Sequence, residues 1–225
     1  MLTDACVHLE KVRLMSHQVP HLLRADAREN RDRVLDAARA LFAQEGIGVT
    51  MRQIARRAEV GPATLYRRFP TKRLLVEAAF EDEVRSCRGI VEDGCAAEEP
   101  WSGFCSVVER LSVLNARNQG FTDAFMLTSP DAGAIAAHRT SLLRMLGGLI
   151  ERAQNAGGLR RDVTVDDLVL VLLAGRGLSA LPLARRQAAA RRYAALVIDG
   201  FRSGEAKQYL PHAARLTRGP EGRTR

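Results

Sequence analysis

Basic side chains gather in one short stretch of this 225-residue sequence. Between Thr50 and Arg73 one acid, Glu59, faces seven basic residues: Arg52, Arg56, Arg57, Arg67, Arg68, Lys72 and Arg73. The local charge of +6 is most of the chain's formal net charge of +8, and the sequence pI is about 10.0. Guanidinium and ammonium groups bind phosphate oxygens, so the stretch predicts a polyanionic partner. Arginine richness alone is weak support, because nearly all 34 basic residues of the chain are arginine.

Two short helices joined by a tight turn are expected to position these residues. Thr50 and Gln53 stand at the spacing of a capping box, which begins a helix. Glu59-Val60-Gly61 follows as a turn, and Pro62 suits the first position of the next helix, where its missing N–H costs nothing. This pattern predicts a helix-turn-helix, whose second helix enters the major groove of DNA.

The second helix carries side chains suited to DNA. Ala63 and Thr64 at its head are small enough to approach base edges, and the hydroxyl and methyl groups of Thr64 can both contact them. Tyr66 offers a phenol to phosphate. Arg67 and Arg68 are added as DNA contacts on charge alone; the alternative is an ordinary solvated face.

From Val49 to Leu75 the sequence resembles the DNA-binding signature of the TetR family of transcriptional regulators. The signature reads T-x-R-x-I-A-x-x-A-x-V, then x-x-T-L-Y-x-x-F, then x-x-K-x-x-L. The residues in register are Thr50, Arg52, Ile54, Ala55, Ala58, Val60, Thr64, Leu65, Tyr66, Phe69, Lys72 and Leu75. The helix expected at Asn30 to Gln44 matches the family's first helix, while Pro70 departs from the polar residue of many members.

The resemblance implies a homodimer that binds palindromic operator DNA, represses transcription and is released by a small-molecule effector. It places DNA contacts at Thr50, Arg52, Thr64, Tyr66 and Lys72. Ile54, Leu65 and Phe69 are expected to be core residues that lock the two helices together. The family's C-terminal region is a helical domain for ligand binding and dimerisation.

The whole chain is predicted to be all-α, a three-helix DNA-binding domain followed by a larger helical domain. Residues 1–27 are expected to be a flexible arm (with Met15 as a second possible start), 28–73 the helix-turn-helix domain, 74–204 the ligand-binding and dimerisation domain, and 205–225 a disordered tail. One long helix is expected from Lys72 to about Val91. Further helices are expected at about 100–118, 121–128, 131–156, 165–181 and 184–202, with Thr164 as a cap.

Two surfaces are predicted in the C-terminal domain. The last two helices should form the dimer contact, through Leu168, Leu172, Tyr193, Leu196, Val197 and Gly200; the alternative is an intrachain core. A pocket for a moderately apolar effector should be lined by Trp101, Phe104, Phe121, Phe125, Met126, His138 and Met145. Each of these is also a candidate core residue, since aromatic and Met side chains at helical spacing more often pack a core.

The sequence favours no other function class. It contains no G-x-S-x-G, P-loop, H-E-x-x-H or G-x-G-x-x-G motif, so no enzyme, cofactor or catalytic residue is predicted. The four cysteines lack metal-ligand spacing, so no metal is expected. We expect free thiols in a reducing cytoplasm instead. No apolar run spans a bilayer, so no membrane partner is expected. A nonspecific architectural DNA-binding protein remains as an alternative, although it would not need the apolar C-terminal half.

Overall fold

The computed structural model describes residues 28–117, 119–127, 133–204, 210–212 and 216. The predicted arm at 1–27 lies outside the described residues, as does most of the predicted tail at 205–225. The described residues are almost wholly helical and contain no strand, only an isolated bridge between Leu159 and Arg202. The predicted all-α class is confirmed.

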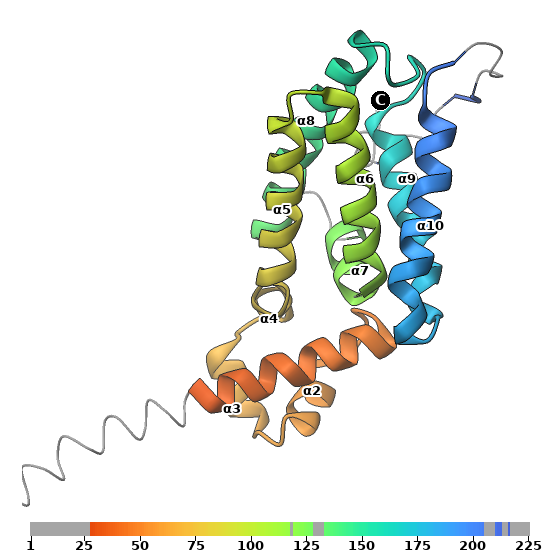
Figure 1. Cartoon of the computed structure of the whole chain (residues 1–225). Helices are drawn as coiled ribbons and strands as arrows, with labels where there is room; N and C mark the ends of the chain where they lie inside the picture. The colour runs from red at the N-terminus through yellow and green to blue at the C-terminus, as the bar shows by residue number, and fades with distance from the viewer. Residues whose placement is uncertain (1–27, 118, 128–132, 205–209, 213–215, 217–225) are drawn as a thin grey trace, which may run out of the picture.

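A small head at one end of the molecule carries a longer helical body (Figure 1). The head consists of the first helix, described at residues 28–45, with α2 (Met51–Arg57) and α3 (Pro62–Arg68). Next come α4 (Lys72–Ala79) and the body helices α5 (Glu81–Ala96), α6 (Pro100–Arg117), α7 (Gln119–Leu127), α8 (Gly133–Asn155), α9 (Val165–Ala174), the 3₁₀ helix η1 (Gly175–Ala180) and α10 (Leu183–Phe201).

Three predicted helix starts are confirmed, two of them with side-chain caps. Thr50 and Gln53 form the capping box of α2, and Pro62 is the first residue of α3. Thr164 caps α9 through Asp167 in a second capping box, with Asp166 also in the first turn, where acids complement the helix dipole. Each of these signals acts within a single turn of helix.

The helix predicted from Lys72 to Val91 is wrong: the structure divides it at Phe80. Phe80 has φ −110° and ψ 17°, outside the helical range, and separates α4 from α5. Its ring is fully buried, between Phe42 of the first helix and Phe121 of α7. Three acids in the first turn of α5 then favour a fresh helix start. The predicted boundary between the helix-turn-helix domain and the C-terminal domain, after residue 73, therefore falls inside α4, before this break.

The helix predicted at 165–181 is also too long. α9 ends at Ala174 and the chain tightens into η1 from Gly175 to Ala180. Gly175 is buried with the Asn115 amide and the Tyr193 ring beside it, and a Cβ there would lie 3.4 Å from each. The change of helix type therefore occurs where η1 packs against both α6 and α10.

The chain after α10 lies back on the α8–α9 connection. The Arg160 N–H donates to Phe201 O at 3.0 Å, and the Ser203 N–H donates to Gly158 O at 3.0 Å. Farther on, the Leu210 N–H donates to an Asp162 carboxylate oxygen at 3.1 Å. In the described part of the predicted disordered tail, the backbone is therefore held by contacts to the body.

α6 is the central helix of the body and packs most extensively against α10 and α5 (Figure 1). It crosses α5 at a pair of glycines, Gly94 and Gly103. A Cβ at Gly94 would lie 2.2 Å from Val107 Cγ2, and one at Gly103 would lie 2.3 Å from the Gly94 carbonyl oxygen. The two helices approach this closely because neither glycine has a side chain.

We expect Gly94→Ala to lower the free energy of unfolding by about 1–3 kcal/mol, because the added methyl overpacks the α5–α6 crossing. Gly89→Ala on the same helix is the control: a Cβ there meets nothing within 4 Å. It should raise the stability by up to about 1 kcal/mol through helix propensity. Urea denaturation of both variants tests the difference, and equal stability would contradict the close crossing.

Candidate nucleic-acid interface

The two short head helices are locked together by buried apolar side chains. Ile54 of α2 is 0% exposed and Leu65 of α3 is 1% exposed, and Phe69 after α3 is buried with them. The predicted core roles of these three residues are therefore confirmed. Between the helices Glu59 adopts φ 55°, an uncommon conformation for a side chain other than glycine, which makes the turn tight.

The face of α3 opposite this core is open. At about 100° per residue, Ala63 and Arg67 lie on the side of the helix away from Leu65, and Thr64 and Tyr66 flank them. Ala63 and Arg67 are exposed, Tyr66 is 47% exposed and Thr64 is half-buried. The outermost surface of α3 thus presents one small residue and one arginine, which allows close approach to a groove.

The arginines around this face have no acid partner within the part of the chain the structure describes. All are exposed: Arg52, Arg56, Arg57, Arg67 and Arg68. Elsewhere exposed arginines sit beside acids, as Arg88 does with Glu92 at 2.7 Å and Arg110 with Asp93 at 2.8 Å. The positive charge of the head is therefore available to an external polyanion, whereas much of that on the body is locally neutralised.

Lys72 and Arg73 begin α4 at the edge of the same surface. Thr71 caps the helix by accepting the Leu74 N–H. Lys72 is half-buried, and this burial lowers the pKa of its ammonium from the ordinary value. Arg73 differs from the other basic residues because its guanidinium lies 3.4 Å from Glu77. Lys72 therefore remains the cation of α4 best placed for a phosphate.

This arrangement of exposed basic side chains suits DNA binding. Thr50 caps α2 and Arg52 lies in its first turn, while Lys72 begins α4. The predicted contacts on α3 are Ala63, Thr64, Tyr66, Arg67 and Arg68. All of these residues are exposed except Thr64 and Lys72, which are half-buried. Among the described residues no group of three or more His, Cys, Asp or Glu side chains could hold a metal ion. The described helices also include none long and apolar enough to cross a bilayer.

Comparison with known proteins decides the family. Residues 34–79 match the family described as "Bacterial regulatory proteins, tetR family", and residues 99–203 match "Transcriptional regulator SbtR-like, C-terminal domain". The HTH-type transcriptional repressor KstR of Mycolicibacterium smegmatis is 32% identical over 138 residues, which are 60% of this chain and 68% of that repressor. The chain belongs to the TetR family. It is therefore a transcriptional regulator and not an enzyme.

Further relatives agree. KstR of Mycobacterium tuberculosis is also 32% identical over 138 residues, covering 60% of this chain and 63% of its own length. A solved TetR-family regulator from Streptomyces coelicolor aligns with a TM-score of 0.61 at 18% identity, over 76% of this chain and 91% of that one. The structure of the ketosteroid transcriptional regulator KstR2 of Mycobacterium tuberculosis aligns with a TM-score of 0.56 at 18% identity. The alignment covers 77% of this chain and 95% of that one. At such identities the structures show a shared fold.

The effector-lining residues predicted in the body fall into separate groups. Trp101 stacks on the fully buried Phe104 with ring centroids 5.9 Å apart, and Phe104 also contacts Phe201. Phe121 and Phe125 contact each other near the head, where His138 meets Phe125 edge-on at 6.4 Å. Met145 packs half-buried against the core, and its carbonyl accepts a weak hydrogen bond from Cys95 at 3.6 Å. The Met126 side chain lies outside the described residues.

Phe121 and Phe125 line a cavity of about 30 Å³ between α6, α7 and α9. Its polar lining, Asn115 and Thr122, was not predicted. The Asn115 amide donates to Leu172 O at 2.6 Å and its carbonyl accepts from the Thr122 hydroxyl. Asn115 follows Leu111 by four residues on the buried face of α6. A polar residue at a core position of the helical period was therefore the available signal.

A second polar pair lies beside this cavity, between α7 and η1. Arg176 Nη2 lies 2.5 Å from Asp123 Oδ1, so the two side chains form an ion pair. Asp123 is buried, which raises the pKa of its carboxyl, and Arg176 opposes that rise. The carboxylate also faces the head, since a Cβ at Gly46 would lie 3.5 Å from Asp123 Oδ2.

The predicted dimer residues are divided between core and surface. The prediction that Leu168 and Leu172 lie at the dimer contact is wrong. They are 1% and 9% exposed and lie in the chain's own core. Val197 packs partly buried against that core, and the Tyr193 hydroxyl donates to Val171 O at 2.8 Å. Leu196 at 61% exposure and Gly200 remain open. α9 adds a residue that was not predicted, Leu170, which is 51% exposed.

We expect Lys72→Ala and Thr64→Ala to weaken DNA binding in different ways. Loss of a phosphate contact at Lys72 should reduce affinity for every duplex alike and lower the salt slope by about one unit. Thr64→Ala should cost about 1–3 kcal/mol on the correct operator alone, because base contacts carry the sequence information. Salt-titrated binding to operator and scrambled duplexes separates the two. If Lys72→Ala lost operator affinity only, Lys72 would not be a phosphate contact.

Proposed function

We propose that the protein is a repressor that binds a palindromic operator as a homodimer and is released when a small molecule binds the body. The observation that carries the proposal is the basic face of α3, whose arginines have no acid partner among the described residues, at one end of a body whose last two helices expose leucines. Repression is the activity named for the KstR relatives. The cytoplasm, where operator DNA is accessible, is the proposed location.

The exposed leucines of α9 and α10 support a homodimer. Leu196 and Gly200 stand four residues apart, so they share one face of α10, and Leu170 adds apolar surface from α9. Water contact with such side chains is unfavourable by about 25 cal/mol per Å² of apolar area. A second copy related by two-fold symmetry would cover the same patch on both chains. Two heads would then face two symmetric half-sites on DNA.

Selection from random duplexes should therefore return a palindrome, with half-site centres separated by one turn of DNA, about 10 base pairs, or a multiple of it. Leu196→Glu should produce monomers, because a carboxylate buried without a partner opposes the interface. The variant should lose affinity for the palindrome and keep the weak affinity for a half-site. Ala195→Glu is the matched control, since Ala195 is exposed on another side of α10. Light scattering that found a folded Leu196→Glu dimer would exclude this interface.

α7 is the element proposed to connect an effector to the head. Its Phe121 lines the cavity and also contacts Phe80, which contacts Phe42 of the first helix. Gly120 lies against the Phe42 backbone, where a Cβ would be 2.6 Å from Phe42 O. A shift of α7 therefore cannot leave the first helix where it is, because both contacts are already close-packed.

The size of the cavity indicates how an effector would act. At about 30 Å³ it is close to the space of a single water molecule, whereas small-molecule sites occupy about 300–1,000 Å³. An effector of that size has to displace α7 or its neighbours to enter. Such a ligand binds the displaced arrangement more tightly and shifts the population toward it; by linkage, operator DNA weakens its binding by the same factor.

We expect Gly120→Ala to weaken palindrome binding by about tenfold, equivalent to about 1.4 kcal/mol, without touching a DNA contact. The added methyl pushes α7 away from Phe42 and changes the position of the head on the body. Binding to an isolated half-site should be unchanged, because the reading face of α3 is intact. Gly148→Ala on α8, where a Cβ meets nothing within 4 Å, is the control. Equal palindrome affinities in both variants would show that this contact does not position the heads.

A further inference from the structure

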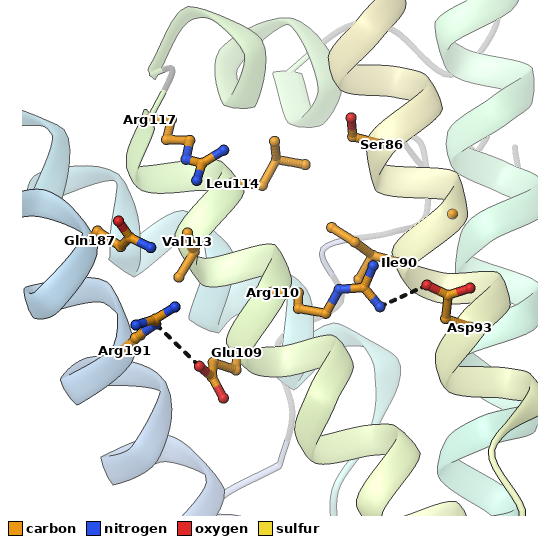
Figure 2. A pocket seen from close by; sticks show the side chains of 11 residues that line it. Ser86, Ile90, Asp93, Glu109, Arg110, Val113, Leu114, Arg117, Gln187 and Arg191 are labelled. Atoms are coloured by element: carbon orange, nitrogen blue, oxygen red, sulfur yellow. Dashed lines mark hydrogen bonds and ion pairs between the residues drawn. The ribbon is translucent and has the colours of Figure 1, made fainter.

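A cleft crosses the outer face of α6 between α5 and α10 (Figure 2). Its volume of about 440 Å³ lies within the range of about 300–1,000 Å³ that is usual for small-molecule sites. Side chains from all three helices line it. It is therefore large enough for a ligand without any movement of helices, in contrast to the cavity beside α7.

Among the described residues, the charges in the cleft leave one cation without an ion-pair partner. Arg110 lies 2.8 Å from Asp93, and Arg191 lies 3.4 Å from Glu109. Arg117 has no ion-pair partner anywhere in the described part of the chain, and Figure 2 draws its guanidinium between Leu114 and Gln187. The lining therefore carries a single uncompensated positive charge, with the Gln187 amide as a neighbouring hydrogen-bond donor.

The floor of the cleft is apolar. Ile90 of α5 is 8% exposed, and Val113 and Leu114 of α6 are half-buried. Gly89 leaves one wall without a side chain, since a Cβ there meets nothing within 4 Å. A ligand lying on this floor would cover apolar surface while its charged end remained at Arg117.

The cleft stays open in the proposed dimer. At about 100° per residue, Gln187 and Arg191 lie about 140–180° around α10 from Leu196 and Gly200. The leucine face and the cleft are thus on opposite flanks of the same helix. A partner chain seated on Leu196 leaves the cleft accessible to solvent.

We propose that this cleft binds a small amphipathic anion, a carboxylate or phosphate ester with a short apolar chain. Its negative group binds Arg117 and Gln187, and its chain lies over Leu114 and Ile90. The charge on Arg117 suits one anionic group, because the other two arginines of the lining are already paired with Asp93 and Glu109. The site is additional to the operator surface and to the cavity beside α7, and it does not depend on either.

Calorimetry on the full chain, without DNA, tests the proposal with three probes below their micelle concentrations. Octyl phosphate supplies both charge and chain, octyl glucoside the chain alone, and inorganic phosphate the charge alone. Octyl phosphate should bind once per chain and at least about tenfold more tightly than either of the others. Equal affinity for octyl glucoside or for inorganic phosphate would overturn the amphipathic site.

Two variants locate the binding. Arg117→Gln should weaken octyl phosphate binding by about tenfold, because it removes a charge-assisted hydrogen bond. Gly89→Trp should weaken it as well by filling the cleft from a position with open space. The controls on α8 are Arg144→Gln and Gly148→Trp, which alter exposed residues outside the lining. If the cleft variants behaved like their controls while melting at the same temperature, the anion would bind elsewhere and the proposal would fail. Operator affinity measured without octyl phosphate should be unchanged in all four, so this failure is distinguishable from failure of the repressor proposal.

Discussion

The packing of the Phe80 ring is the constraint on which the rest of the structure depends. The ring is fully buried, and its centroid lies 5.7 Å from that of Phe42 in the head and 5.8 Å from that of Phe121 in the body. Aromatic pairs at this separation add about 0.5–1.5 kcal/mol beyond the burial of their area. Because the same side chain ends α4 and starts α5, the position of the head is fixed by core packing and not by a free linker.

The head has further attachments that act with this contact. Arg39 Nε donates to Ala79 O at 2.7 Å, which fixes α4 on the first helix. Glu77 of α4 accepts the Ala134 N–H at 2.9 Å, so a carboxylate of the head-side helix lies at the start of α8. α4 therefore touches both the DNA-reading unit and the body. α4 thus connects Lys72 in its first turn with Phe80 at its end and, through Glu77, with α8.

The parts of the structure predictable from sequence are those that depend on local contacts. The caps at Thr50 and Thr164 and the Pro62 helix start each act within one turn, and the buried roles of Ile54 and Leu65 follow from helical periodicity. The break at Phe80 was missed because apolar residues continue at helical spacing on both sides of it. Its cause is a contact with Phe121, 41 positions later, which no local pattern contains. The division between Leu168 in the core and Leu170 on the surface likewise depends on which neighbours cover α9.

The two ends of the body differ in how well their polar groups are satisfied. At the α5–α6 crossing, Gly94 and Gly103 bring backbones together without polar side chains. Near the head, four buried polar atoms lack a hydrogen-bond partner within the described protein: Ser112 Oγ, Asp123 Oδ1, His138 Nε2 and Arg176 Nε. Each such group costs about 1–3 kcal/mol unless a water or a rearranged neighbour satisfies it. For Asp123 the ion pair with Arg176, 2.5 Å away, offsets this cost. Under the proposed repressor mechanism, we expect an effector to displace the body at this end, because Phe121 of α7 contacts Phe80 and Phe80 contacts Phe42 of the head. The α5–α6 crossing offers no such route, because its two glycines leave no space between the backbones.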